Sequence, residues 1–351
     1  MKLNRYPLVL AILIAALLLT SCGSAMTTSS WPGLTVSGET AYLAAGNWVE
    51  AVKVSDGTMS WRYPAKLDAR RFFYAAPALS NSLMVVGDYS NTIYGLDPTN
   101  GAEKWKFTEA KGRIIGSPLL LADVVVVPSA DHYIYGLDLQ GKLLWKFQAK
   151  NMNWAAPISD GTHVLIASMD KTLYALDPKT GAKVWATPLG GSVMQAPLLK
   201  DNVLYLGTLA NEIMAVDATS GSITWRKAVD AAVWATPVEK DRSLYFGDVT
   251  GKAYSIASKD GALVWSLTLG GAIISSPAVS SDALFFPNED GSLYKVSLKG
   301  EKQWGHPVDG KLYASPQQAG DFLLVPISAG TKLLVALDAN GNEVWSFVSP
   351  K

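Results

Sequence analysis

The hydrophobic pattern of residues 157–188 predicts four short strands in one unit. Residues 157–160 (PISD) begin at a proline, which suits the first residue of a strand. Residues 162–168 (THVLIAS) are apolar and rich in β-formers, residues 172–177 (TLYALD) alternate, and residues 183–188 (KVWATP) follow a turn. The connecting segments DGT (160–162) and DPKTG (177–181) carry turn residues. The unit therefore reads as a four-stranded antiparallel sheet.

This unit recurs along the chain with two markers in phase. A glycine stands four residues before a tryptophan in each copy, and successive tryptophans lie 39 to 44 residues apart. A proline precedes each of these tryptophans by 27 to 29 residues. The pairs are Gly57/Trp61, Gly101/Trp105, Gly141/Trp145, Gly181/Trp185, Gly221/Trp225, Gly261/Trp265, Gly300/Trp304 and Gly341/Trp345. The prolines are Pro32, Pro77, Pro118, Pro157, Pro197, Pro237, Pro277 and Pro316.

The period predicts an all-β protein, an eight-bladed β-propeller of four-stranded antiparallel blades over residues 31–351. A solenoid of stacked sheets is the alternative, but its ends would need caps. Because the first repeat starts at Pro32 and the last one ends after Trp345, each blade should consist of four consecutive strands. We expect the ring to close by packing of the first blade against the last, without a swapped strand.

The N-terminal segment has the features of an export signal. Lys2 and Arg5 precede an apolar run at residues 8–19, which is too short to span a bilayer. Residues 19–22 (LTSC) resemble the bacterial lipobox, and Cys22 is the single cysteine of the chain. We therefore predict a lipoprotein signal peptide at 1–21, then a lipidated Cys22 and a flexible tether at 22–30. An ordinary secretory signal is the alternative.

The anchor would place the protein in the cell envelope. In a cell with two membranes we expect the outer membrane, facing the periplasm; otherwise we expect the outer surface of the cytoplasmic membrane. Without Lys2 and Arg5, the 30 Lys and Arg residues fall to 28, against 30 Asp and Glu. A chain with no basic excess is a poor candidate for binding nucleic acid.

Residues 174–185 (YALDPKTGAKVW) carry a recognisable motif. Ala175, Asp177, Thr180, Gly181 and Trp185 match the pattern Ala-x-Asp-x-x-Thr-Gly-x-x-x-Trp. This resembles the tryptophan-docking motif of the PQQ-like (quinoprotein-type) propeller repeats. The resemblance implies that each of the eight tryptophans lies on an outer strand and packs against the neighbouring blade.

The resemblance also raises the question of an enzyme. Pyrroloquinoline quinone (PQQ) dehydrogenases of this fold use a vicinal cysteine pair and a calcium site with acidic ligands, and this chain has one cysteine. We therefore expect no PQQ, no metal and no enzymatic activity. Motifs of the HExxH, GxSxG, P-loop and GxGxxG types are absent from the sequence.

Acidic residues do recur in the turns between second and third strands, and we interpret them as solvated turn residues. These are Asp88, Asp131, Asp170, Asp248, Glu289 and Asp290.

A lipobox followed by eight bare repeats resembles the propeller lipoproteins of the outer-membrane barrel-assembly machinery. That resemblance implies a non-enzymatic scaffold with a protein partner among the barrel-assembly components, held at the membrane through Cys22. Two alternatives stay open: an exported receptor for a small molecule or glycan, and a PQQ-dependent dehydrogenase.

Large side chains recur three residues before the prolines, on loops that should lead to the innermost strands near the central channel. They alternate between aromatic residues and smaller ones, and form either a hydrophobic plug or a stacking platform. The connection at 62–77 is the longest of its kind and adds basic and aromatic residues. The candidate binding rim comprises Arg70, Arg71, Phe72, Tyr74, Arg113, Trp154, Trp234, Lys311 and Tyr313.

Overall fold

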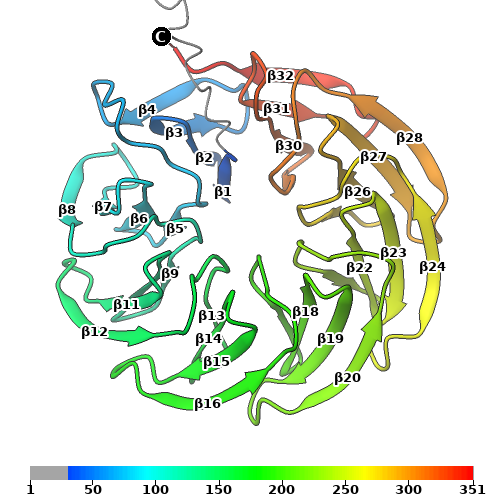
Figure 1. Ribbon diagram of the computed structural model, residues 1–351. Helices are drawn as coiled ribbons and strands as arrows, with labels where there is room; N and C mark the ends of the chain where they lie inside the picture. The colour runs from blue at the N-terminus through cyan, green and yellow to red at the C-terminus, as the bar shows by residue number, and fades with distance from the viewer. Residues whose placement is uncertain (1–30, 351) are drawn as a thin grey trace, which may run out of the picture.

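A computed structural model describes residues 31–350 of the chain, so the signal peptide, Cys22 and the tether lie outside the described residues. Eight four-stranded antiparallel sheets stand in a ring (Figure 1). The first four blades comprise β1 (Gly33–Ser37), β2 (Thr40–Ala45), β3 (Trp48–Lys53), β4 (Met59–Tyr63); β5 (Ala78–Leu79), β6 (Met84–Gly87), β7 (Ile93–Leu96), β8 (Glu103–Phe107); β9 (Leu119–Leu120), β10 (Val125–Pro128), β11 (Tyr133–Leu137), β12 (Leu143–Gln148); β13 (Ile158–Ser159), β14 (Val164–Ala167), β15 (Thr172–Leu176) and β16 (Lys183–Pro188).

The last four blades complete the ring and are built in the same order, from a short inner strand to a longer outer one. They comprise β17 (Leu198–Lys200), β18 (Val203–Thr208), β19 (Glu212–Asp217), β20 (Ile223–Ala228); β21 (Val238–Lys240), β22 (Ser243–Gly247), β23 (Lys252–Ala257), β24 (Leu263–Thr268); β25 (Ala278–Val279), β26 (Ala283–Pro287), β27 (Ser292–Ser297), β28 (Lys302–Pro307); β29 (Gln317–Ala319), β30 (Phe322–Pro326), β31 (Leu334–Leu337) and β32 (Glu343–Phe347).

The predicted fold is confirmed, including the way in which the ring closes. Each sheet holds four consecutive strands, β1 to β4 in the first blade and β29 to β32 in the last. No strand in the described residues is exchanged between these two blades. In residues 31–350, no helix is long and apolar enough to cross a membrane.

The hydrophobic core is divided among the interfaces between blades. The second and third strands are buried almost throughout, as in β14 and β15, because both of their faces meet neighbouring blades. At the closing interface, Leu34 and Leu43 of the first blade pack in one cluster with Leu324 and Ala336 of the last. Apolar burial therefore holds the ring together where no strand crosses.

The docking tryptophans explain why a glycine recurs four residues before each of them. The ring of Trp145 lies against Gly181 of the next blade, where a Cβ would overlap the indole. Gly181 also has a φ of +67°, which a side chain disfavours. The indole Nε1 of Trp145 donates to the Pro178 carbonyl at 2.9 Å. The same ring contact joins Trp61 to Gly101, Trp105 to Gly141, Trp185 to Gly221, Trp225 to Gly261, Trp265 to Gly300, Trp304 to Gly341 and Trp345 to Gly57.

A β-bulge aims each tryptophan at its neighbour. Ala175 pairs with Trp185 while the next residue, Leu176, pairs with Lys183, so Val184 is an extra residue in the outer strand. The equivalent shift occurs in every pairing of a third with a fourth strand. A bulge bends the strand locally and redirects side chains, and it leaves Val184 51% exposed.

Candidate binding cavity at the channel mouth

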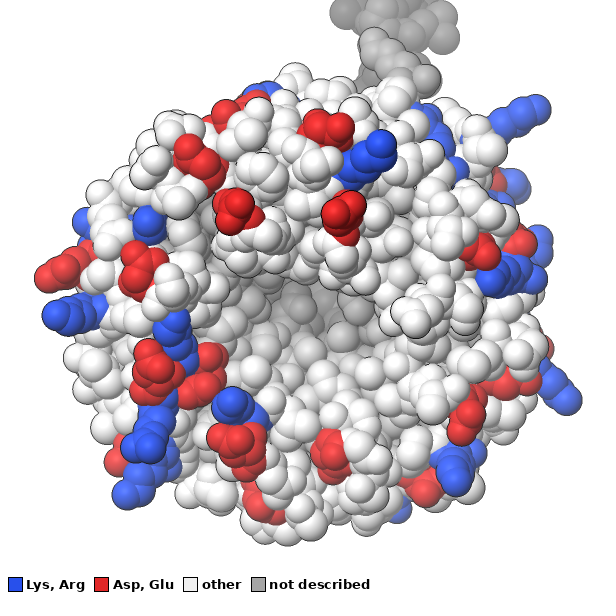
Figure 2. Space-filling view, turned by 180° about the vertical axis from the view of Figure 1, so that it is seen from behind, with Lys and Arg blue, Asp and Glu red and all other residues white. Residues whose placement is uncertain are grey.

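The loops that lead into the innermost strands surround a cavity of about 410 Å³ at the centre of the ring. Six of the large residues that stand three positions before a proline line it, and the aromatic ones do not seal it. These six are Tyr74, Ile115, Trp154, Met194, Trp234 and Tyr313. The lining residues include no Lys, Arg, Asp, Glu or His. Figure 2 shows the ring hollowed at its centre, with charged side chains placed around the hollow.

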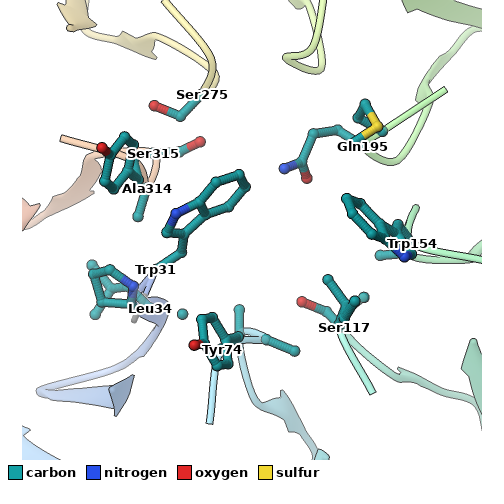
Figure 3. A pocket seen from close by; sticks show the side chains of 18 of the residues that line it. Trp31, Leu34, Tyr74, Ser117, Trp154, Gln195, Ser275, Ala314 and Ser315 are labelled. Atoms are coloured by element: carbon teal, nitrogen blue, oxygen red, sulfur yellow. The ribbon is translucent and has the colours of Figure 1, made fainter. Parts of the chain in front are cut away.

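Trp31, which is not among the predicted rim residues, lies inside this cavity. Its indole projects into the middle of the space, opposite Trp154 and Gln195 (Figure 3). The indole stacks on Tyr313, with ring centroids 5.4 Å apart and planes 30° apart. It also contacts Trp234 at 6.0 Å between centroids. Three aromatic rings from three different blades therefore meet at one side of the cavity.

Tyr74 and Tyr89 form a second aromatic wall. Their rings stack with centroids 3.8 Å apart and planes 13° apart, and the guanidinium of Arg113 lies 5.0 Å from the Tyr89 centroid. Burial raises the pKa of Tyr89 to about 12, so this phenol stays neutral in any ordinary buffer. Arg113 thus supports a lining residue from the side and is not part of the lining itself.

Lys311 and Glu289 stand over Tyr313. The Tyr313 hydroxyl donates to Glu289 Oε1 at 3.1 Å, and Lys311 Nζ lies 3.4 Å from the same oxygen. Lys311 Nζ is also 5.7 Å from the centroid of the Tyr313 ring. This charged pair is half-exposed, so it adds a polar margin beside the uncharged cavity.

Three predicted rim residues lie elsewhere. The side chain of Arg70 is 85% exposed and pairs with Asp68 at 3.2 Å. Phe72 is half-buried and does not line the cavity. Arg71 differs most from the prediction, because its guanidinium packs at the interface of the first two blades. There it donates to the Tyr63 hydroxyl at 2.8 Å and lies 5.0 Å from the centroid of Tyr94. Arg71 therefore supports packing between blades.

The interpretation of the acidic turn residues as solvated is wrong for Asp88 and Asp248, which are fully buried. Asp88 accepts a hydrogen bond from the Tyr94 hydroxyl at 3.0 Å, and Asp248 accepts one from Tyr254 at 2.8 Å. Burial raises the pKa of Asp88, although backbone and tyrosine donors act against that shift. These carboxylates fasten the turn between second and third strands to the third strand, a role that the spacing alone did not reveal.

The cofactor of the wider fold family, PQQ, is a polycarboxylate quinone, so its site needs cationic partners and metal ligands. The lining of the cavity offers neither lysine nor arginine. Within residues 31–350, no group of three or more His, Cys, Asp or Glu side chains could hold a metal ion. The residues of this cavity do not fit PQQ, because a polyanion in an uncharged apolar site would lose its hydration without compensation.

The signal that could have identified Trp31 is a break in the repeat. The residue directly before the proline is small in every other blade, whereas the first blade has Trp31 there. The small residues are Ala76, Ser117, Ala156, Ala196, Thr236, Ser276 and Ser315. Gln195 shows a similar break, because the residue two positions before the proline is Ala, Gly or Ser in every other blade, whereas Ser275 at that position carries no such signal.

Eight blades joined by tryptophan–glycine contacts define this protein as a β-propeller of PQQ-like repeats. A sequence model of the family described as outer membrane protein assembly factor BamB matches residues 45–159, 130–236 and 210–350. These segments together span most of the chain, which therefore belongs to that family.

Individual relatives match at low identity and include both BamB proteins and enzymes. BamB of Legionella pneumophila (strain Paris) is 27% identical over 143 residues, which cover 40% of this chain and 36% of that protein. The lanthanide-dependent methanol dehydrogenase of Methylorubrum extorquens is 30% identical over 171 residues, which cover 37% of this chain and 28% of that enzyme. The matched segments span from 10% to 36% of the curated relatives.

Among solved structures, BamB from Moraxella catarrhalis superposes with a TM-score of 0.71 at 20% sequence identity. The superposition covers 88% of this chain and 91% of that one. At this identity the likeness establishes a shared fold, and function has to be argued from the site.

Proposed function

We propose that this protein is a membrane-anchored, non-enzymatic scaffold that binds a protein partner in outer-membrane protein assembly. The observation that carries the proposal is the aromatic, uncharged cavity at the channel mouth, in a chain that the BamB family model matches from residue 45 to residue 350. Aromatic side chains in a partly open site are typical anchors of protein interfaces. The absence of charge from the lining disfavours an ionic substrate.

Anchoring through Cys22 would orient this cavity. Cys22 precedes Trp31 by nine residues, and Trp31 lies in the cavity. Nine residues span at most about 30 Å when fully extended. We propose that the channel mouth faces the membrane within that distance. Mass spectrometry of the mature N-terminus should find an acylated Cys22, and Cys22→Ala should release the protein from the membrane. Unmodified Cys22 in membrane-bound protein would contradict the anchor.

Site-specific photocrosslinking in native membranes tests the scaffold function. We would place p-benzoylphenylalanine at Gln195, which lines the cavity, and at Val184, which is exposed on the outer strand β16. The Gln195 probe should capture a component of the barrel-assembly machinery, and the Val184 probe should not. Equal capture by both probes, or none by either, would contradict a partner at the channel mouth.

A tryptophan variant provides an independent check. Trp154→Ala combined with Trp234→Ala removes two half-buried rings from the cavity. We expect the recovery of the partner from membranes to fall at least tenfold while the circular dichroism spectrum stays unchanged. Loss of the fold in this variant would favour a structural plug in place of a binding site.

A receptor for a neutral small molecule or glycan is the second candidate, because about 410 Å³ lies in the usual range for small-ligand pockets. Binding of such a ligand without capture of a partner protein would favour it. We propose that PQQ is not a cofactor, on the chemistry of the lining. Calorimetry with PQQ and calcium should give no binding heat, and dye reduction would contradict the proposal.

A further inference from the structure

Trp31 breaks the repeat at a position where every other blade has Ala, Ser or Thr. Those small residues let the loops between blades converge on a narrow mouth. Within residues 31–350, no blade comes before the first one in the chain, so Trp31 is not on a loop between two described blades. Trp31 therefore has the space that a connecting loop fills at the other blades, and its indole extends into the mouth.

The contacts of Trp31 reach the neighbouring last blade and also the sixth blade, which is not a neighbour of the first. Trp31 precedes β1 in the first blade, Tyr313 precedes β29 in the last, and Trp234 precedes β21 in the sixth. The indole thus extends into the channel mouth (Figure 3) and rests on rings that belong to two other blades. The docking tryptophans differ in this respect, because each of those rests on a glycine of the neighbouring blade.

Trp31 is placed so that it could leave without loss of a strand. Pairing of β1 with β2 begins at Gly33, which is opposite Ala44, so Trp31 lies outside the sheet. A cavity of about 410 Å³ is present although the indole of Trp31, which belongs to its lining, already projects into it. The remaining walls include Trp154, Gln195 and the stacked Tyr74 and Tyr89.

We propose that Trp31 is an intramolecular occupant of the cavity, and that the external ligand is an extended peptide segment carrying an exposed aromatic side chain, which competes with Trp31. The inference rests on the proposed protein-binding function and specifies the partner chemistry of that site. The chain's own Trp31-Pro32-Gly33 segment shows how an aromatic residue followed by extended backbone fits among these rings. Offset or tilted aromatic pairs supply the attraction, and the uncharged lining favours a neutral segment.

The probe is a synthetic peptide with the sequence of residues 29–34 (SSWPGL), and its control has alanine in place of tryptophan. Calorimetry would compare the wild-type protein with its Trp31→Ala variant, both as full mature chains in detergent. We expect the variant to bind the tryptophan peptide at least tenfold more tightly than the wild type, because the internal competitor is gone. The alanine peptide should bind neither protein.

A second substitution locates the binding. In the Trp31→Ala background, Trp234→Ala removes one ring of the subsite and should weaken peptide binding at least tenfold. Trp48→Phe, outside the cavity lining, is the matched control and should leave it unchanged. Equal affinity of the wild type and Trp31→Ala, no binding to either, or no effect of Trp234→Ala would overturn the proposal.

A readout in the wild-type protein covers the case in which Trp31→Ala does not fold. Fluorine NMR of protein labelled with 5-fluorotryptophan resolves the Trp31 signal, which Trp31→Phe assigns by its loss. Saturating tryptophan peptide should shift that signal towards the position of a solvent-exposed indole, and no shift would overturn the proposal. If the Gln195 probe captures a partner and the tryptophan peptide does not reduce that capture, the scaffold function stands and this peptide occupant is rejected.

Discussion

Trp345 of the last blade lies against Gly57 of the first, and this contact closes the ring. A Cβ on Gly57 would come within 2.5 Å of Trp345 Cε3, so the indole rests directly on the glycine. The Nε1 of Trp345 donates to the Val54 carbonyl at 3.0 Å. The closing interface therefore uses the same tryptophan–glycine contact that joins every other pair of neighbouring blades.

Replacement of Trp345 should destabilise the protein in two distinguishable steps. Trp345→Ala removes both the packing and the hydrogen bond, and should lower the free energy of unfolding by about 3 kcal/mol. Trp345→Phe keeps most of the packing and loses the bond to Val54, at a cost of about 1 kcal/mol. Urea unfolding followed by tryptophan fluorescence measures both. Equal midpoints for the two variants would contradict the docking role.

Trp185 provides a matched comparison, because its buried Nε1 has no hydrogen-bond partner in the described residues. Trp185→Phe therefore removes no hydrogen bond and should cost less than Trp345→Phe. Trp185→Ala should still cost about 3 kcal/mol, since the ring packs on Gly221. If Trp185→Phe is the more damaging of the two phenylalanine variants, the indole hydrogen bond does not explain the ranking.

Gly57→Ala should test why the motif needs glycine. The backbone at Gly57 has a φ of +74°, and the new Cβ would overlap the ring of Trp345. Gly38, with a φ of +56° and no atom within 4 Å of such a Cβ, is the control. Gly38→Ala should cost about 1 kcal/mol from the backbone alone, and Gly57→Ala clearly more. Similar losses of thermal stability would mean that the contact with Trp345 is unimportant.

Glu50, which contacts Ser349 near the C-terminus, should make the stability of the fold depend on pH. It is 1% exposed, and its Oε1 accepts a hydrogen bond from Ser349 at 2.7 Å. Burial raises the pKa of Glu50 in the folded state, although Ser349 and Arg62 act against that shift. Because the folded pKa is the higher one, the protonated form stabilises the fold, and this contribution is lost as pH rises through the folded pKa.

Glu50→Gln should therefore raise the melting temperature at pH 7 and reduce its decline between pH 4 and pH 7. The amide oxygen can still accept from Ser349, so the contact with the C-terminal segment persists. Glu39→Gln, at an exposed position, serves as the control and should change neither. A lower melting temperature for Glu50→Gln at pH 7 would show that the charge itself stabilises the fold.

Asp97 should behave in the opposite sense. Hydrogen bonds from the hydroxyl and amide of Thr99 and from Lys104 lower the pKa of Asp97 to about 2. Its contribution to stability is therefore present above the ordinary carboxyl pKa and is lost as pH falls from about 4 through about 2. Thr99→Ala should raise the pKa of Asp97 in an NMR titration, and Thr99→Ser should keep it low. An unchanged value in Thr99→Ala would reject the hydroxyl as the main cause.

The sequence pattern was sufficient to predict the ring, because the interactions that build the ring act within one repeat or between consecutive repeats. Strand alternation, turn residues and the Gly181–Trp185 spacing act within one blade, and the contact of Trp145 with Gly181 spans only one interface. Closure follows from the same rule, since Trp345 finds in Gly57 the partner that every other docking tryptophan finds in the following blade.

The candidate site was predicted only in part. Position relative to the prolines identified Tyr74, Trp154, Trp234 and Tyr313 as residues near the channel, and they line the cavity. The position of a residue in a loop does not fix the direction of its side chain. The side chain of Arg71 packs in the interface between the first two blades.

By itself, the sequence determined the number of blades and their order, because these depend on a period that each repeat restates, while the docking of the tryptophans followed from the resemblance of their motif to the PQQ-like repeats. Only the tertiary structure decided that Trp31 extends into the channel mouth to meet Tyr313 and Trp234, and that Asp88 is buried beneath its turn. Both outcomes depend on the space left when eight loops converge on one axis. That space is a property of the closed ring, and no single repeat encodes it.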